Sequence, residues 1–435
     1  MRALPGPRGA LPGGRLIALR RHPETFLHLA RRYGDVVSFT VGAQPVVLLS
    51  HPAHVEAVLE TQQARFRKGW GPLPEGALGG GLIASEGEVH RRHRRALLPL
   101  FHGGRLPGYA RSVVSMAEAM TDGWRVGEVI DLWDAMKKLT SGFVSRALLG
   151  VGEDRRRLFC EASELVTRQF SSHMSAWAGL ARALDPRRWR LARALRRLDE
   201  EVYALIDERR AAALGGEDLV SILVRQGELD DQEIRDEVVT LFVAGYETIA
   251  LALTWSGSLV ATHPAARHRL WEEVDAIDPE TPLGSAHLAR LPYARAVLSE
   301  AMRLFPPKWM LGRLAIEEVD LGDATISPGT LVLVSPYVVH RDPRFFAEPE
   351  RFMPERWLSR PTPAPPKFAY FPFGAGSRRC IGEGLAWMEG TLAAAVIARR
   401  WALEPRAGRP RLDPRITLRP RSGMAVRLVR RPEAR

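Results

Sequence analysis

The longest helical pattern in the sequence restricts the fold more than any other feature, and it runs from about Asp230 to Thr262. Asp230 can cap the N-terminus while Glu233 reaches back to the cap, which is a capping-box arrangement. His263-Pro264 ends the pattern, because proline breaks a helix and restricts the residue before it. About 32 residues rising 1.5 Å each give roughly 48 Å, enough to cross a large domain. The pattern predicts a mainly helical fold with one long helix.

Helical patterns dominate the rest of the chain as well, and β-prone segments are few. The patterns predict helices over 23–33, 54–60 and most of 87–275, and strands over 36–41, 46–49 and parts of 314–333. No Gly- or Pro-rich tract is long enough to separate domains. We therefore predict a breaker-rich arm over 1–22 and one mainly α domain with a small β portion over 23–435.

Charge and cysteine content exclude several classes of protein. The net charge is +12, but the basic residues are almost all Arg and are spread along the chain without interleaved aromatic residues. This spread argues against a nucleic-acid binder and favours an acidic protein partner on one basic face. The two cysteines, Cys160 and Cys380, are too few for a disulfide framework or a four-cysteine metal site. Either cysteine remains a candidate thiolate.

The sequence gives no sign of secretion or of a membrane anchor. A transmembrane helix needs about 20 consecutive apolar residues. The richest segment, residues 241–260, is interrupted by Tyr246, Glu247 and Thr248. The N-terminus has neither the apolar core of a signal peptide nor a cleavage site. We therefore expect a cytoplasmic protein without a transmembrane anchor.

Residues 373–382 surround the second cysteine with features that favour a thiolate. Two glycines permit a tight loop before Cys380, and a helical run begins after Gly382 and continues to about Arg400. A cysteine at a helix N-terminus is stabilised as a thiolate by free N–H groups and the helix dipole. The flanking Phe373 and Ile381 are expected to shield it from water. A lone cysteine in such a place is otherwise a small structural hydrophobe.

The centre of the long helix breaks the usual rules for a helix interior. Gly245, Glu247 and Thr248 lie within its most apolar part. Such local conflicts tend to mark functional sites. The alternative is a kinked core helix in which the Thr248 hydroxyl bonds to the preceding turn.

Four motifs occur in a fixed order along the chain. Residues 244–248 read Ala-Gly-x-acid-Thr, 300–303 read Glu-x-x-Arg, 354–357 read Pro-Glu-Arg-Trp and 373–382 read Phe-x-x-Gly-x-Arg-x-Cys-x-Gly. In this combination the sequence resembles the cytochrome P450 family over nearly its whole length, from about residue 23 to 429. It resembles the bacterial, soluble members and, in several short segments, the branch that hydroxylates carotenoid rings. Trp357 departs from the phenylalanine usual in the third motif.

The resemblance implies a single-domain P450 fold with haem b between the long helix and the cysteine loop. It implies that Cys380 is the axial ligand of the iron and that Thr248 and Glu247 deliver protons to bound dioxygen. Gly245 would let the helix open locally beside the dioxygen. The other cofactor-binding residues that it implies are Phe373, Gly374, Arg378, Gly382, Arg313, Ala244, Arg94 and His90, the last standing where tryptophan is common.

A structural triad is also implied. Glu300 and Arg303 are three residues apart, so they share one face of a helix and can together hold Arg356. In the family such a triad ties the helix to the loop that approaches the cysteine. We interpret these three residues as structural support and not as catalytic groups.

The function implied is a haem-thiolate monooxygenase that uses dioxygen and hydroxylates a large hydrophobic molecule. No flavin segment follows the cysteine region, so electrons are expected from NAD(P)H through a ferredoxin and a ferredoxin reductase. A basic surface that includes Arg379, and Arg91, Arg92 and Arg95, would suit an acidic ferredoxin.

The substrate expectation rests on apolar segments. Residues expected to line the pocket occur at 82–84, at 241–244 and at 309–311. The leading substrate is a carotenoid ring, and the alternatives are a fatty acid or a terpenoid or steroid. A haem-thiolate sensor or electron carrier is the non-enzymatic alternative, although such a protein would not need the acid-Thr pair.

Overall fold

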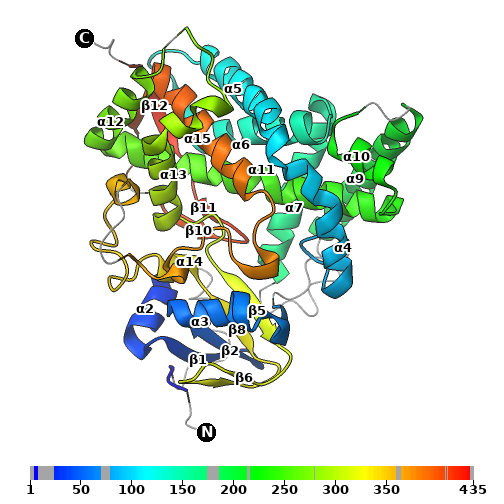
Figure 1. Cartoon of the computed structure of the whole chain (residues 1–435), viewed down its shortest axis with the longest axis vertical. Helices are drawn as coiled ribbons and strands as arrows, with labels where there is room; N and C mark the ends of the chain where they lie inside the picture. The colour runs from blue at the N-terminus through cyan, green and yellow to red at the C-terminus, as the bar shows by residue number, and fades with distance from the viewer. Residues whose placement is uncertain are drawn as a thin grey trace. The chain divides into compact units, whose positions relative to one another are not determined.

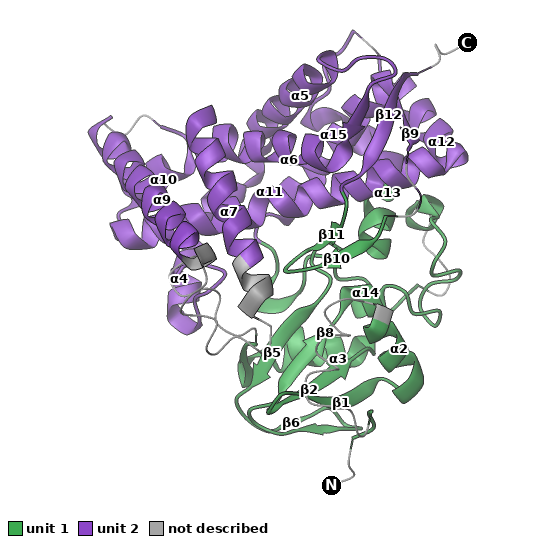
Figure 2. Cartoon of the chain, turned by 180° about the vertical axis from the view of Figure 1, so that it is seen from behind, with its two compact units in different colours: residues 1–71, 296–380, 409–422 green, residues 72–295, 381–408, 423–435 purple. Residues whose placement is uncertain are grey.

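The computed structural model describes residues 4–7, 24–69, 79–173, 186–212, 216–278, 280–358, 364–406, 408 and 410–431. Most of the arm predicted for 1–22 therefore lies outside the described residues. The chain forms two compact units, each assembled from separate stretches of sequence (Figure 2). Unit 1 comprises residues 1–71, 296–380 and 409–422, and unit 2 comprises 72–295, 381–408 and 423–435. The assignment of 23–435 to one domain stays a prediction.

Unit 1 is built on a five-stranded sheet that joins the two β-prone regions of the sequence (Figure 1). Its strand order is β1 (Val36–Val41), β2 (Gln44–Leu49), β8 (Leu331–Val334), β5 (Leu311–Ala315) and β3 (Phe66–Lys68). The pairing of β2 with β8 is parallel, with Val46 opposite Leu331, and the other pairings are antiparallel. The predicted hairpin is thus correct, but its turn is tighter than expected because β2 already begins at Gln44.

Short helices and strand pairs complete unit 1. The helices are α2 (Glu24–Tyr33), α3 (Pro52–Glu56), α14 (Pro336–Val339) and the part of α13 (Pro292–Leu304) from residue 296 onward. The two small strand pairs are β6 (Val319–Asp320) with β7 (Thr325–Ile326), and β10 (Leu412–Pro414) with β11 (Leu418–Pro420). The helix predicted for 54–60 is α3 followed by a π-helical turn over Ala57–Thr61.

Unit 2 is mainly helical, as the sequence predicts. Its helices are α4 (Gly87–Leu97), α5 (Leu106–Asp122), α6 (Leu132–Phe143), α7 (Glu153–His173), α9 (Pro186–Ala211), α10 (Leu219–Gln226), α11 (Asp231–Thr262), α12 (Pro264–Asp275) and α15 (Glu383–Arg400). A small sheet, with the order β4 (Val129–Asp131), β12 (Ala425–Arg430) and β9 (Trp401–Pro405), joins distant parts of the chain. The sequence patterns did not predict these three strands.

Helix α11 confirms the long helix expected from the sequence. It begins with the capping box of Asp230 and Glu233 and ends before His263. By length and composition it could cross a membrane, contrary to the expectation that no segment is long and apolar enough, but 78% of its most apolar window is buried inside the protein. Two of its buried hydroxyls, those of Thr254 and Ser256, donate to carbonyl oxygens one turn earlier. We therefore interpret α11 as a core helix.

Candidate active site

The loop before Cys380 has a fixed backbone conformation within unit 1. The Gly374 N–H donates to the Phe371 carbonyl at 3.0 Å, and the Cys380 N–H donates to the Phe373 carbonyl at 3.0 Å. Gly376 has a φ of +64°, and a Cβ on it would overlap the carbonyl oxygen of Leu59. Only glycine can adopt this conformation so close to another backbone. The signature glycines therefore hold Cys380 at a defined end of the loop.

Gln63, which lies outside the motif of residues 373–382, supports this loop. Its side-chain oxygen accepts hydrogen bonds from both the backbone N–H and the hydroxyl of Ser377, each at 2.8 Å. Gln63 and Leu59 lie more than 300 residues earlier in the chain. No local sequence signal identifies them, because their role depends entirely on the tertiary fold.

The two cysteines have different environments. Cys380 is exposed, and it lies two residues before Gly382, the N-cap residue of α15, which carries no side-chain cap. Cys160 is half-buried, and burial raises the pKa of its thiol. A thiolate ligand must be deprotonated and accessible, so Cys380 fits a haem iron and Cys160 does not.

The expected shielding of the cysteine by its neighbours is wrong. Phe373 and Ile381 are themselves only half-buried, and the protein's own side chains leave Cys380 exposed. An open thiol of this kind fits a large planar ligand such as haem.

The acid-Thr motif of α11 lies in unit 2 and is part of a continuous α-helix. The Thr248 hydroxyl donates to the Ala244 carbonyl at 3.0 Å, which is the back-bond that the structural alternative proposed. The local opening expected at Gly245 is not observed, because the α-helical pattern continues through it. Glu247 is buried, whereas Ala244 and Thr248 are half-buried. The Thr248 side chain therefore bonds to the backbone of its own helix and is also partly accessible.

Helix α6 contacts this motif directly. The Thr140 hydroxyl donates to the Tyr246 carbonyl at 2.9 Å, and the Tyr246 hydroxyl donates to the Ser163 hydroxyl of α7 at 3.2 Å. Both contacts are buried, so they fix the motif's position on neighbouring helices. The sequence analysis did not identify Thr140 or Ser163.

The basic residues expected to bind the cofactor lie in both units. Arg313 lies on β5 and is half-buried, with Nη1 donating to the Gly312 carbonyl at 2.9 Å. On α4, His90 is buried and Arg94 is half-buried, and their spacing of four residues places them on one helix face. Arg378, in the cysteine loop, is half-buried. Their roles toward a haem stay predictions.

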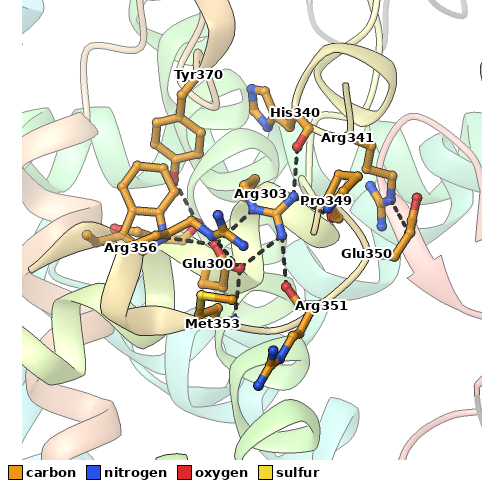
Figure 3. Close-up of polar contacts among 12 residues, drawn as sticks. Glu300, Arg303, His340, Arg341, Pro349, Glu350, Arg351, Met353, Arg356 and Tyr370 are labelled. Atoms are coloured by element: carbon orange, nitrogen blue, oxygen red, sulfur yellow. Dashed lines mark hydrogen bonds and ion pairs between the residues drawn. The ribbon is translucent and has the colours of Figure 1, made fainter. Parts of the chain in front are cut away.

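Glu300 and Arg303 form a fully buried ion pair on α13 (Figure 3). Both side chains are 0% exposed, and the guanidinium donates twice to the carboxylate at 2.9 Å. Arg356 Nε adds a bond to Glu300 Oε1 at 3.0 Å, as the triad predicts. The indole of Trp357 donates to Glu300 Oε2 at 2.9 Å, so the residue that departs from the family motif also belongs to this network.

Arg303 also binds the backbone of the segment between α14 and the cysteine loop. It donates to the carbonyl oxygens of His340, Pro349 and Arg351. Within this segment, Figure 3 shows these carbonyl groups pointing toward the guanidinium. Hydrogen bonds therefore satisfy both the guanidinium and the carboxylate of this buried ion pair, and a buried pair is tolerated only under that condition. We conclude that the triad is structural.

Five residues expected to line a substrate pocket are buried: Leu82, Leu241 and Phe242 in unit 2, and Trp309 and Met310 in unit 1. Trp309 and Met310 are 5% and 6% exposed, within the apolar cluster around Val37 and Leu48. The Trp309 ring packs edge-on against Phe26, and its indole donates to the Arg415 carbonyl at 2.9 Å. Their large apolar side chains suit a core as well as a pocket, so sequence alone could not separate the two.

Glu389 on α15 is a buried acidic residue of unit 2 whose protonation should make the stability of the protein depend on pH. It is 3% exposed, Oε1 has no hydrogen-bond partner among the described residues, and burial raises its pKa well above the ordinary value. At a pH between the ordinary and the raised pKa, its carboxyl group keeps its proton in the folded protein and loses it on unfolding. The free energy of unfolding should fall as pH rises above the ordinary glutamate value toward the raised pKa.

The Glu389→Gln variant should lose this pH dependence, because glutamine is neutral at every pH. Urea unfolding of both proteins at about pH 5 and at about pH 8 would measure it. The variant should gain stability relative to the wild type at the higher pH. Identical pH slopes would show that Glu389 is ionised in the folded protein.

Comparisons with known proteins agree with the fold and the motifs. Residues 5–426 match the family model described as Cytochrome P450. "Cyclooctatin synthase" from Streptomyces melanosporofaciens is 37% identical over 95% of this chain and 93% of its own length. "Cyclooctat-9-en-7-ol 5-monooxygenase" from the same organism is 35% identical over 93% of this chain and 91% of its own.

The fold is similar to a solved structure as well. The cytochrome P450DA heme domain superposes with a TM-score of 0.88, at 24% identity, over 99% of this chain and 97% of its own. The chain belongs to the cytochrome P450 family and is one of its monooxygenases. Membership implies a haem whose iron has a cysteine thiolate ligand, electrons from redox partners and a hydrophobic substrate.

Proposed function

We propose that this P450 oxidises a cyclic terpenoid in the cytoplasm, with Cys380 as the iron ligand and with electrons from a ferredoxin. The observation that carries the substrate class is the similarity, over more than nine-tenths of the chain, to a relative named for a cyclic hydrocarbon alcohol. This favours the terpenoid alternative over the carotenoid ring that the sequence analysis ranked first. The half-buried Ile83, Ala84, Val243 and Ala244 supply apolar surface for such a molecule.

The chemistry is divided between the cofactor and two side chains of α11. The haem, when bound, supplies reductive activation of dioxygen. The Thr248 hydroxyl can break its bond to the Ala244 carbonyl and donate its proton to a ligand on the accessible side of the helix. The buried carboxylate of Glu247 is chemically suited to receive protons and pass them on.

Charge supports the choice of an acidic electron donor, although fewer arginines contribute than the sequence suggested. Arg91 pairs with Glu88, and Arg92 pairs with Glu233, so their charges are largely compensated. Arg95 and Arg379 are exposed. Turnover with a ferredoxin should weaken as salt is raised, because ions screen exposed charges beyond about 10 Å at 0.1 M ionic strength.

The substrate class is tested by spectral titration of the haem-loaded protein with cyclooctat-9-en-7-ol, a long-chain fatty acid and a carotenoid. We expect the terpenoid alcohol to shift the Soret band at the lowest concentration. Saturation by the carotenoid or the fatty acid at lower concentration would overturn the terpenoid assignment. NADPH-dependent product formation with added redox partners would exclude a sensor or electron carrier.

The role of Thr248 is tested by the Thr248→Ala variant. It should still bind haem and substrate, but product formed per NADPH consumed should fall by about tenfold or more, with peroxide released instead. Thr254→Ala is the matched control, since Thr254 makes the same kind of back-bond on α11 but is fully buried. Equal coupling in wild type and the Thr248→Ala variant would remove Thr248 from the mechanism.

A further inference from the structure

Glycines at 79–81 lie directly against α11 within unit 2. The Gly80 N–H donates to Asp236 Oδ2 at 2.6 Å. A Cβ on Gly81 would lie 2.7 Å from the Asp236 carbonyl oxygen and would overlap the Thr240 hydroxyl. The backbone of this segment therefore touches the helix without intervening side chains, an approach that only glycine permits.

Asp236 is held from its other side as well. Its Oδ1 accepts a bond from Arg235 Nη1 at 2.8 Å, and both side chains are 6% exposed. Arg235 also pairs with Asp199 of α9. Both oxygens of the Asp236 carboxylate are therefore hydrogen-bonded, one to the buried guanidinium of Arg235 and one, in a partly buried contact, to the Gly80 N–H, and the charge of the carboxylate makes this a strong anchor.

The next residue of α11, Glu237, connects that helix to α4. Glu237 Oε1 lies 2.6 Å from His93 Nδ1, and the two side chains are buried. The hydrogen bond to Glu237 raises the pKa of His93. Burial raises the pKa of Glu237, while His93 and the backbone N–H of Leu82 lower it. Glu237 thus ties α11 to α4, one residue after the contact of Asp236 with Gly80.

The segment itself is a compact turn. The N–H groups of Ala84 and Ser85 both point to the Gly81 carbonyl, at 2.7 and 2.9 Å. Leu82 is buried in it, whereas Ile83 and Ala84 are half-buried. Because Gly81 is fixed on α11, the turn fixes the positions of Ile83 and Ala84, the apolar residues suggested above to contact the substrate.

We propose that Asp236 is a positioning residue for substrate binding, which anchors the turn of residues 79–85 so that Ile83 and Ala84 form a fixed wall against a bulky apolar molecule. This inference rests on the proposed function, because it assumes a bulky apolar substrate. The proposal predicts different effects on small and on bulky ligands of the iron. A small ligand of the iron does not depend on the turn, whereas a bulky one does.

The test uses the haem-loaded Asp236→Ala variant with two azole probes, imidazole and the bulky clotrimazole, and with hydrogen exchange of the backbone amides. Loss of one hydrogen bond to a charged group should raise exchange in residues 80–85 by about tenfold and weaken clotrimazole binding by about tenfold. Imidazole binding should change by less than about twofold. Asp231→Ala, which removes an exposed carboxylate of the same helix that pairs with Arg210, is the matched control.

The Gly81→Ala variant disturbs the contact between the turn and α11 from the side of the turn. It tests the proposal if the Asp236→Ala variant does not fold. Its matched control is Gly103→Ala, where a Cβ meets nothing within 4 Å. Unchanged clotrimazole affinity despite faster exchange, unchanged exchange, or equal loss of both azoles would overturn the proposal. Retained imidazole binding in these variants would leave the proposed function standing. Failure of the wild type to bind either azole would instead contradict the proposed function and the inference with it.

Discussion

Replacing Arg303 with alanine is expected to lower the free energy of unfolding by about 3–5 kcal/mol, because the buried Glu300 carboxylate loses its bidentate partner. Three backbone carbonyls, those of His340, Pro349 and Arg351, lose their donor at the same time. Glu300→Ala should cost a similar amount, since it leaves Arg303 and Arg356 without their shared carboxylate. Urea unfolding measured for each variant gives the change directly.

The matched control for this pair lies in the same unit. Arg351 and Glu348 have the same spacing of three residues and pair at 2.9 Å, but their side chains are 63% and 57% exposed. Exposed pairs contribute about 0–1 kcal/mol, so Glu348→Ala should be nearly neutral. If Glu300→Ala is also nearly neutral, the triad does not support the fold.

The same substitutions should reduce haem retention. Two further hydrogen bonds hold the chain that leads to the cysteine loop, one partly buried bond to α13 and one buried bond to His340. The Tyr370 hydroxyl donates to the Ser299 carbonyl at 3.0 Å, and the Phe371 N–H donates to His340 Nε2 at 2.9 Å. Burial and nearby arginines lower the pKa of His340 well below its ordinary value, so it is a neutral acceptor. Fully haem-loaded Glu300→Ala protein would show that the loop does not depend on this network.

The features that sequence predicted correctly are those determined by local chemistry. The capping box of Asp230 and Glu233 and the proline after His263 define α11 almost to the residue. The glycine turns before Cys380 and the start of α15 after Gly382 follow from conformational preferences of single residues. The Glu300–Arg303 pair follows from the spacing of a helix.

The features that sequence missed depend on contacts between distant segments. Strand β4 has only three residues and pairs with β12 from nearly the other end of the chain, and β12 pairs on its other side with β9. Gln63 supports the cysteine loop from the far end of the sequence. Trp309 and Met310 were assigned to a pocket because apolar side chains suit both a pocket and a core. Local patterns contain no information that separates these outcomes.

Replacing Cys380 with alanine should abolish thiolate ligation of the haem, which is the largest functional effect expected. Cys380 is the exposed cysteine, at the end of a loop fixed by backbone bonds and glycine turns. Cys160 is its natural control, since it is half-buried, has a raised pKa and contacts Arg156 and Ser141. Cys160→Ala should leave the haem spectrum unchanged.

The carbon monoxide spectrum of the reduced, haem-loaded protein tests the central claim most directly. Wild type and Cys160→Ala should both show the red-shifted Soret band of thiolate-ligated haem, because thiolate donates electron density to the iron. The Cys380→Ala variant should lack this band. A red-shifted band that persists in the Cys380→Ala variant, or one that is lost in the Cys160→Ala variant, would contradict the assignment of Cys380 as the iron ligand.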